Sequence, residues 1–226
     1  MFQKASTKKI LFLDPANFVG GAELFLLNFM KFILAENLSL SLFTTGLKTY
    51  VDQVPAGVKV SKVDMPRLRR NWKVIFELIR SVKVLRTRIN KDKPDLVVSN
   101  TIRSHVLSGF ALKRENIPLI WILHDYTFPK IFLRLLIRVP YRIICVSHGV
   151  RRSVLKTVGN KYQYKIVVIT NAVDLLEISR LKEAPLSLAQ EKADSEFWIG
   201  NIGRIEPWKG QLFFLLAAEK VIQALP

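Results

Sequence analysis

Several features that would place the protein in a class are scarce or missing. The 226 residues include one cysteine, Cys145, which excludes an intrachain disulfide and does not indicate an oxidising compartment. No apolar run approaches the ~18 residues of a membrane helix, because Asn28 and Lys31 break one candidate and three arginines between residues 134 and 142 break another. The apolar run at residues 10–13 is too short for a signal-peptide core. We expect a cytoplasmic protein, either soluble or peripheral at the inner face of the membrane.

Familiar catalytic motifs are missing as well. The sequence has no GxSxG elbow, no GxGxxG after its first expected strand and no GxxxxGK[ST] loop, which argues against a hydrolase, a dehydrogenase and a Walker-type nucleotide-binding protein. The three histidines, His105, His124 and His148, lie on separate segments without metal-ligand spacing. We therefore expect no metal site.

Negative charge is also scarce. With 35 basic and 18 acidic residues, the formal net charge is +17, which suits nucleic acid, an anionic membrane or phosphorylated small molecules. Residues 67–93 hold ten Lys or Arg against two acids. The sequence shows no winged helix, zinc spacing or RNP-type aromatic pattern. A basic nucleic-acid-binding protein remains an alternative, although we expect no specific nucleic-acid partner.

Apolar runs and amphipathic stretches alternate along most of the chain. This alternation predicts a parallel sheet with helices on both faces, an α/β Rossmann-like fold whose functional loops follow the strands. The expected strands are residues 8–14, 38–44, 58–63, 95–99, 118–123, 142–146 and 165–169, and the expected helices are residues 22–36, 72–90, 104–115, 130–137 and 149–158.

The last fifty residues have a different composition. We expect a first domain over residues 1–176, a polar linker rich in Ala, Glu and Lys over 177–196, and the incomplete start of a second domain over 197–226. That start is expected to contain a strand, residues 197–202, and a helix, residues 211–225.

The segment GRIEPWKG, residues 203–210, follows the expected late strand and leads into the last helix. A diphosphate needs cations at fixed positions and backbone N–H donors. Arg204 and Lys209 provide the charge, and the helix N-terminus provides the donors. The same pattern is compatible with a surface turn that carries two solvated cations.

The segment FVGGAE, residues 18–23, connects the first strand to the first helix. Gly20 and Gly21 permit close approach of a ligand or a positive φ. An anion or a sugar hydroxyl would fit this loop. The alternative is a tight turn in which Glu23 stabilises the first helical turn.

Polar residues follow several other expected strands. His124 and Asp125 come directly after a strand, where parallel sheets bind ligands; the alternative is that they cap the strand end and the next turn. Ser99–Asn100 and Ser147–His148 are each interpreted as helix caps. Residues 171–174 read as an ordinary turn when taken alone.

In this order and spacing, these segments resemble the retaining, two-domain glycosyltransferases called family four or group one. The resemblance covers nearly the whole chain. It rests on the following residues: Gly20-Gly21-Ala22-Glu23, His124-Asp125, Ser147, Asn171-Ala172-Val173-Asp174, and Gly203-Arg204 with Lys209-Gly210.

The resemblance implies a GT-B arrangement, of which residues 1–176 would be the acceptor-side domain. It also implies transfer of a sugar from a nucleotide diphosphate sugar, without cofactor or metal. Arg204 and Lys209 would hold the diphosphate and stabilise charge on the leaving group, and His124 would contact the transferred sugar or the acceptor. The remaining residues implied in donor or acceptor binding are Gly20, Gly21, Glu23, Asp125, Ser147, Asn171 and Gly203.

Partners follow from the same resemblance: a nucleotide-sugar donor and a glycan or lipid-linked acceptor, such as one used for cell-envelope polysaccharide. The basic stretch 67–93 would either bind anionic lipid or remain an ordinary solvated helix.

The pattern departs from the family in two places. Ala172 stands where the family usually has glycine, which would cost ~1 to 3 kcal/mol if that turn needs a positive φ. The family's Glu-x7-Glu segment is not within the 226 residues. We expect the chain to be truncated relative to the family, to bind donor weakly and to turn over slowly, unless a separate C-terminal half completes it. A catalytically inactive subunit or a truncated gene product is the alternative.

Overall fold

The computed structural model describes residues 7–68, 73–126, 129–172, 175–182 and 198–224. The chain divides into two compact units, residues 1–173 and residues 174–226. Among the described residues, no helix is both long and apolar enough to cross a membrane.

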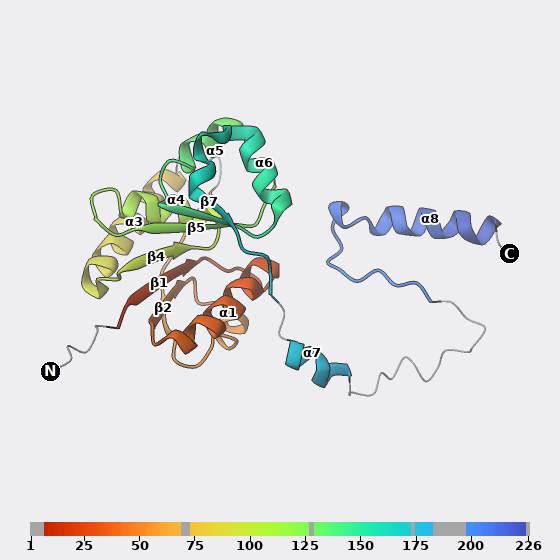
Figure 1. The fold of residues 1–226 in the computed structure, drawn as a ribbon, viewed down its shortest axis with the longest axis horizontal. Helices are drawn as coiled ribbons and strands as arrows, with labels where there is room; N and C mark the ends of the chain where they lie inside the picture. Colours follow the sequence, from red (N-terminus) through yellow and green to blue (C-terminus); the bar gives the residue numbers. More distant parts are fainter. Residues whose placement is uncertain (1–6, 69–72, 127–128, 173–174, 183–197, 225–226) are drawn as a thin grey trace. The chain divides into compact units, whose positions relative to one another are not determined.

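The first unit is built on a seven-stranded sheet in the order β3-β2-β1-β4-β5-β6-β7, with every neighbouring pair parallel (Figure 1). The order reverses between β1 and β4. Loops on either side of such a switch point diverge and leave room for a ligand. The strands are β1 Lys9–Asp14, β2 Ser39–Thr44, β3 Lys59–Lys62, β4 Leu96–Ser99, β5 Leu119–Leu123, β6 Arg142–Cys145 and β7 Ile166–Val168.

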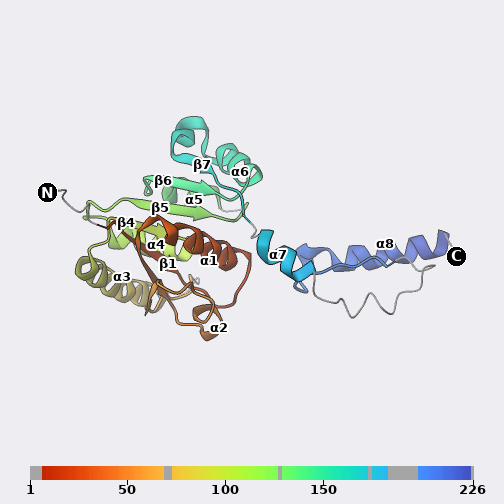
Figure 2. The ribbon, with the colours of Figure 1, turned by 60° about the horizontal axis from the view of Figure 1, so that its bottom comes forward.

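Helices connect the strands of the first unit, and α7 and α8 belong to the second unit. They are α1 Gly21–Ile33, α2 Lys48–Val51, α3 Lys73–Asp92, α4 Ile102–Ala111, α5 Lys130–Leu136, α6 His148–Val158, α7 Leu175–Lys182 and α8 Gln211–Ala224. Short 3-10 turns are η1 Leu34–Glu36, η2 Asn160–Lys165 and η4 Pro207–Lys209. In the turned view of Figure 2, as in Figure 1, α3 lies beside α4.

The two faces of the sheet bury different helices, because successive strand residues point to opposite sides. Leu11 and Leu13 of β1 pack in a cluster with residues of α3 and α4. Phe12, between them, packs in a cluster with α1 residues such as Leu26 and Met30. A third cluster joins β5 and β6 to α5 and α6. The α/β Rossmann-like prediction is therefore confirmed.

In the first unit, strand positions agree with the sequence prediction to within one residue at each end, whereas one helix is displaced. The helix predicted for 104–115 begins at Ile102 and ends at Ala111. Thr101 caps it, because its hydroxyl accepts from the backbone N–H of Ser104 while the Ser104 hydroxyl accepts from the backbone N–H of Thr101.

One expectation for the second unit is wrong within the described residues. Residues 198–202, predicted as part of a strand, form no strand; residue 197 lies outside the described part. A strand exists through pairing with a neighbour, and no such pairing is found for these residues. Helix α7, residues 175–182, occupies the beginning of the segment predicted as linker.

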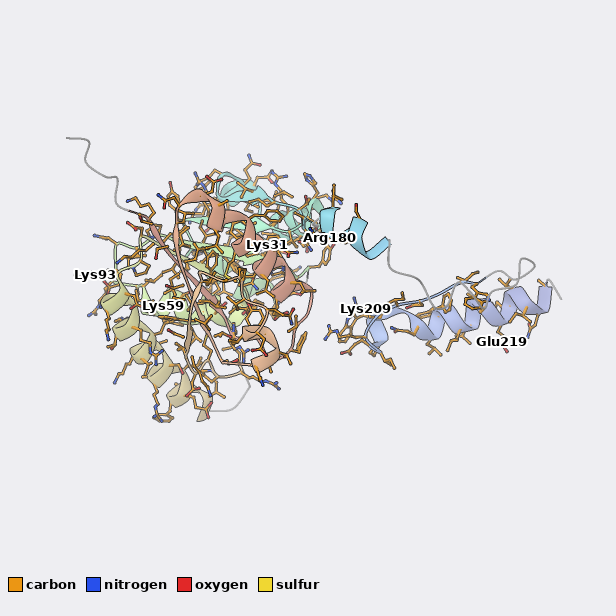
Figure 3. The ribbon with its side chains drawn as sticks, turned by 90° about the horizontal axis from the view of Figure 1, so that it is seen from below. Lys31, Lys59, Lys93, Arg180, Lys209 and Glu219 are labelled. Carbon is orange, nitrogen blue, oxygen red and sulfur yellow. The ribbon has the colours of Figure 1, made fainter. Side chains whose placement is uncertain are left out.

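The second unit exposes much apolar surface. Figure 3 shows Lys209 just before α8 and Glu219 further along that helix. The α8 residues Leu212 and Phe213 are 67% and 74% exposed, so the helix has no buried apolar stripe of the kind that stabilises helices in globular proteins.

The burial of Phe12 gives a first test. Phe12 is fully buried on β1, whereas Phe110 on α4 is 59% exposed. Phe12→Ala is expected to lower the free energy of unfolding of the first unit by about 3 to 5 kcal/mol, because it removes buried area and leaves a cavity. The matched control Phe110→Ala should cost less than about 1 kcal/mol. Urea unfolding measures both, and equal losses would contradict the assigned core.

Candidate functional site

Three polar side chains meet at the carboxyl ends of the neighbouring strands β1, β4 and β5. Asp14 is the last residue of β1, Asn100 follows β4 and His124 follows β5. Asn100 Nδ2 donates to Asp14 Oδ2 at 3.0 Å, and His124 Nε2 lies 2.9 Å from Asn100 Oδ1. The cluster sits at the switch point of the sheet, where open α/β sheets bind ligands.

Asp14 is the innermost member of this cluster. It is fully buried, and its Oδ2 also accepts from the Tyr50 hydroxyl at 2.9 Å. Burial, followed by the charge of Glu23, raises the pKa of Asp14 to about 7; hydrogen bonds from Tyr50 and Asn100 and the charge of Arg103 oppose the rise. Burial and the neighbouring Asp14 raise the pKa of Tyr50. Asp14 can therefore change its charge near neutral pH.

The GGAE loop is fastened to this cluster. Asn100 Nδ2 donates to the carbonyl of Ala22 at 3.0 Å. The Glu23 carboxylate accepts from the backbone N–H of Gly20 at 3.0 Å and is almost fully buried. A carboxylate thus already faces the positive end of α1, which disfavours a second anion there.

The two glycines of this loop differ in their surroundings. A Cβ at Gly20 would lie 2.7 Å from the Phe18 ring, whereas a Cβ at Gly21 would meet no atom within 4 Å. A side chain at Gly20 would therefore require the half-exposed Phe18 ring to move. Gly21 leaves open space at the beginning of α1.

His124 is held by packing as well as by Asn100. Its ring meets the Phe25 ring in a T-shaped contact, with centroids 5.4 Å apart. Burial lowers the pKa of His124 to about 4, so the ring is neutral at pH 7. Burial also raises the pKa of the adjacent Asp125.

Helix capping explains one strand end and not the other. Ser147 caps α6 by accepting from the backbone N–H of Val150 at 3.1 Å, which confirms that interpretation. The same interpretation of Ser99–Asn100 is wrong, because Thr101 caps α4. Ser99 instead contacts the buried His105, with Oγ 3.1 Å from Nδ1.

His105 is a core residue. Its ring stacks on Trp121 with centroids 4.2 Å apart, and its Nε2 lies 3.2 Å from the Leu136 carbonyl oxygen. Burial lowers its pKa to about 4.

The remaining predicted site residues lie in the second unit or on its border. Gln211 Nε2 donates to the Arg204 carbonyl at 2.7 Å. Gly210 takes a positive φ of 75° immediately before α8, as only glycine does without strain. Gly203, Arg204 and Lys209 are exposed, and their approach to His124 stays a prediction.

The expected strain at Ala172 is not observed. Among described residues, the non-glycine positions with positive φ are Asn37 and Lys93. Asn171 and Ala172 are exposed, and residues 173–174 of that turn lie outside the described part.

A groove of about 770 Å³ lies between α3 and the segment that follows β3. Its lining includes the cations Lys62, Arg80 and Arg88 together with the acids Asp64 and Glu77. Neither His124 nor Asn100 lines it. Within the described ranges, no group of three or more His, Cys, Asp or Glu side chains is placed to hold a metal ion.

The doubly wound parallel sheet defines a Rossmann-like unit with a polar cluster at its switch point. Residues 19–176 match the model of glycosyltransferase family 4, and the chain belongs to this family. Comparison with curated protein sequences gives no match.

Solved structures share the fold. HepE from Anabaena, in complex with UDP-glucose, is 23% identical with a TM-score of 0.68 over 94% of this chain and 57% of its own. A glycosyltransferase from Rickettsia africae is 22% identical with a TM-score of 0.70 over 96% and 58%. The lipopolysaccharide outer core galactosyltransferase WaaB is 16% identical with a TM-score of 0.55 over 74% and 46%. The chain thus spans less than three fifths of the length of these proteins.

Sequence reasoning missed Asp14, Tyr50 and the bridging role of Asn100. Asp14 and Asn100 each follow an apolar run, so the rule that polar residues at strand ends face the ligand could have found both. Tyr50 lies on the short helix α2 and gave no sequence signal.

The buried carboxyl group gives a test in pH. The pKa of Asp14 is about 7 in the folded chain and 3.8 in the reference state, so the folded chain holds the extra proton between pH 4 and 7. Its contribution to stability therefore falls as pH rises through this window, by up to ~4 kcal/mol. Asp14→Asn removes this dependence, and the variant should gain roughly 2 to 4 kcal/mol relative to the wild type between pH 4.5 and 7.5.

Urea unfolding at a series of pH values measures this difference. The histidines titrate in both proteins, so their effect cancels. The exposed Asp52→Asn serves as the control and should follow the wild-type curve. Parallel curves for wild type and Asp14→Asn would contradict the raised pKa.

Proposed function

We propose that the protein acts in the transfer of a sugar from a nucleotide diphosphate sugar to an acceptor, with retention of the anomeric configuration and without a metal or other cofactor. The observation that carries the proposal is the Asp14–Asn100–His124 cluster at the switch point of a chain that belongs to glycosyltransferase family 4. That HepE was solved with UDP-glucose supports a UDP-sugar as the first donor to test.

The two units supply different chemistry in this proposal. In the second unit, Arg204 and Lys209 bind the donor diphosphate and stabilise the charge that builds up on the leaving group. Gly203 allows the backbone to approach the phosphates. In the first unit, His124 contacts the transferred sugar or the acceptor, and the open space at Gly21 admits a hydroxyl.

The cations of the second unit give the first functional test. Arg204→Ala and Lys209→Ala should each lower kcat/KM about 100-fold or more, the usual loss when a donor to a developing charge is removed. Lys220, exposed on α8, provides the control: Lys220→Ala should match the wild type. The measurement is release of nucleotide from a panel of UDP- and other nucleotide sugars, with and without added chelator and with any co-purifying chain retained.

The anomeric configuration of the product tests the proposal that the reaction proceeds with retention. Proton NMR of the new glycoside should show the anomeric configuration of the donor. Inversion would contradict retention, and equal rates for all variants would contradict the diphosphate site. Donor binding without turnover would favour the inactive-subunit alternative.

We also propose that α3 binds an anionic membrane surface, which suits a lipid-linked acceptor. In its first two turns, Ile75, Phe76 and Ile79 are 57%, 65% and 49% exposed. Arg80 and Lys83, further along the helix, are exposed cations. Apolar side chains beside cations are typical of helices that lie in the interface of anionic bilayers. Arg80 also lines the groove beside α3, where an acceptor would lie close to the lipid.

Vesicle sedimentation tests this surface. Vesicles that contain phosphatidylglycerol should bind the protein, and pure phosphatidylcholine vesicles should not. Arg80→Ser with Lys83→Ser should weaken binding by about 2 kcal/mol, or roughly 30-fold. Arg152→Ser with Lys156→Ser on α6 removes the same charge elsewhere and should have a smaller effect. Equal binding to both kinds of vesicle, or equal losses for both variants, would contradict the proposal.

A further inference from the structure

We propose that Asn100, oriented by Asp14, is a positioning residue that keeps the proton of the His124 ring on Nε2 and leaves Nδ1 as a hydrogen-bond acceptor for a ligand hydroxyl. The assignment follows from the order of donors and acceptors in the cluster. That the hydroxyl belongs to a sugar substrate rests on the proposed transferase function, whereas the position of the proton does not.

The orientation of the Asn100 amide is determined by its neighbours. Nδ2 lies 3.0 Å from Asp14 Oδ2 and 3.0 Å from the carbonyl oxygen of Ala22. The carbonyl oxygen of Ala22 can never donate, and Asp14 Oδ2 already accepts from the Tyr50 hydroxyl. A flipped amide would place its own oxygen against the Ala22 carbonyl oxygen, with no proton between them. The amide nitrogen must therefore face Asp14 and Ala22.

This orientation determines the state of the His124 ring. With both Nδ2 protons used, Asn100 presents Oδ1 to His124 Nε2 at 2.9 Å. An oxygen without a proton can only accept here, so Nε2 must carry the hydrogen. Burial lowers the pKa of the ring to about 4, and a neutral ring with its proton on Nε2 has a lone pair on Nδ1. Among the described residues, no donor contacts Nδ1.

A lone pair at this point selects the chemistry of the ligand. It accepts from a hydroxyl or an N–H group and repels the oxygens of a phosphate dianion. The buried carboxylate of Glu23 and the carboxyl group of Asp14 make the same end of the sheet unfavourable for an anion. The subsite at His124 therefore takes a hydroxyl-bearing group and not the diphosphate.

Asp14 holds the Asn100 amide in this orientation. Tyr50 donates to the same Oδ2 that accepts from Asn100, which holds the carboxyl group in place. Four residues from three strand ends and α2 thus form one chain of donors and acceptors that finishes at His124.

Nitrogen NMR of the 226-residue chain with ¹⁵N-labelled histidine tests the assignment without any ligand. Loss of its signals in His124→Gln identifies His124 among the three histidines. In the wild type at pH 7.5, Nε2 should resonate as a protonated ring nitrogen and Nδ1 as a bare one. Asn100→Ala should move both resonances toward the average of the two tautomers. Asn90→Ala, an exposed asparagine on α3, should leave them unchanged.

A proton on Nδ1 in the wild type, or an unchanged His124 spectrum in folded Asn100→Ala, would overturn the proposal. If Asn100→Ala does not fold, the exchange Asp14→Asn with Asn100→Asp replaces it. The amide now at position 14 would donate to the carboxylate now at position 100, which still accepts from Nε2. Retention of the Nε2 proton supports the proposal, and its loss refutes it.

Titration with inorganic phosphate tests the ligand class separately. The Nδ1 resonance should not move at millimolar phosphate, and a saturable shift would overturn the assignment to a hydroxyl. These measurements need neither donor nor turnover, so they stand even if the proposed transferase function fails.

Discussion

The hydrogen bond between the Asn100 amide and the Asp14 carboxyl group is the contact on which the rest of the site depends. It joins the two central strands at the point where the strand order reverses. The same amide holds the GGAE loop through the Ala22 carbonyl and faces the His124 ring. Removing one partner would leave buried polar groups unsatisfied at two strand ends and one loop, which is costlier than the loss of a single surface bond.

The net charge of +17 hides a difference between the two units in the charges near their candidate binding residues. The binding end of the first unit contains buried Asp14 and Glu23, while the cations predicted to hold a diphosphate, Arg204 and Lys209, are exposed in the second unit. The loop that resembled an anion site from sequence has its helix N-terminus already occupied by Glu23. Under the proposed function, the second unit therefore binds the phosphates, and the first unit binds neutral, hydroxyl-bearing groups.

The sequence predicted the fold better than the site. Apolar runs locate parallel strands because both faces of the sheet are buried, so the strand limits agree closely. The strand prediction failed for residues 198–202, because an apolar run alone does not provide a neighbouring strand to pair with. The roles of the residues in the cluster could not be predicted from the sequence. Asp14 and Asn100 are 86 residues apart in sequence, and their contact depends on the order of the strands in the sheet. The family motifs nevertheless led to His124, which the structure places in this cluster.

Burial raises the pKa of the Asp14 carboxyl group and lowers the pKa values of the His105 and His124 rings. In acid, folding holds a proton on Asp14 and forces the neutral form on His105 and His124, since their pKa values are about 7, 4 and 4. The carboxyl group favours the folded state at low pH, and the imidazoles favour it at high pH. The Asp14 carboxyl group and the two imidazoles therefore change the stability of the first unit with pH in opposite directions, and their effects partly cancel between about pH 4 and 7.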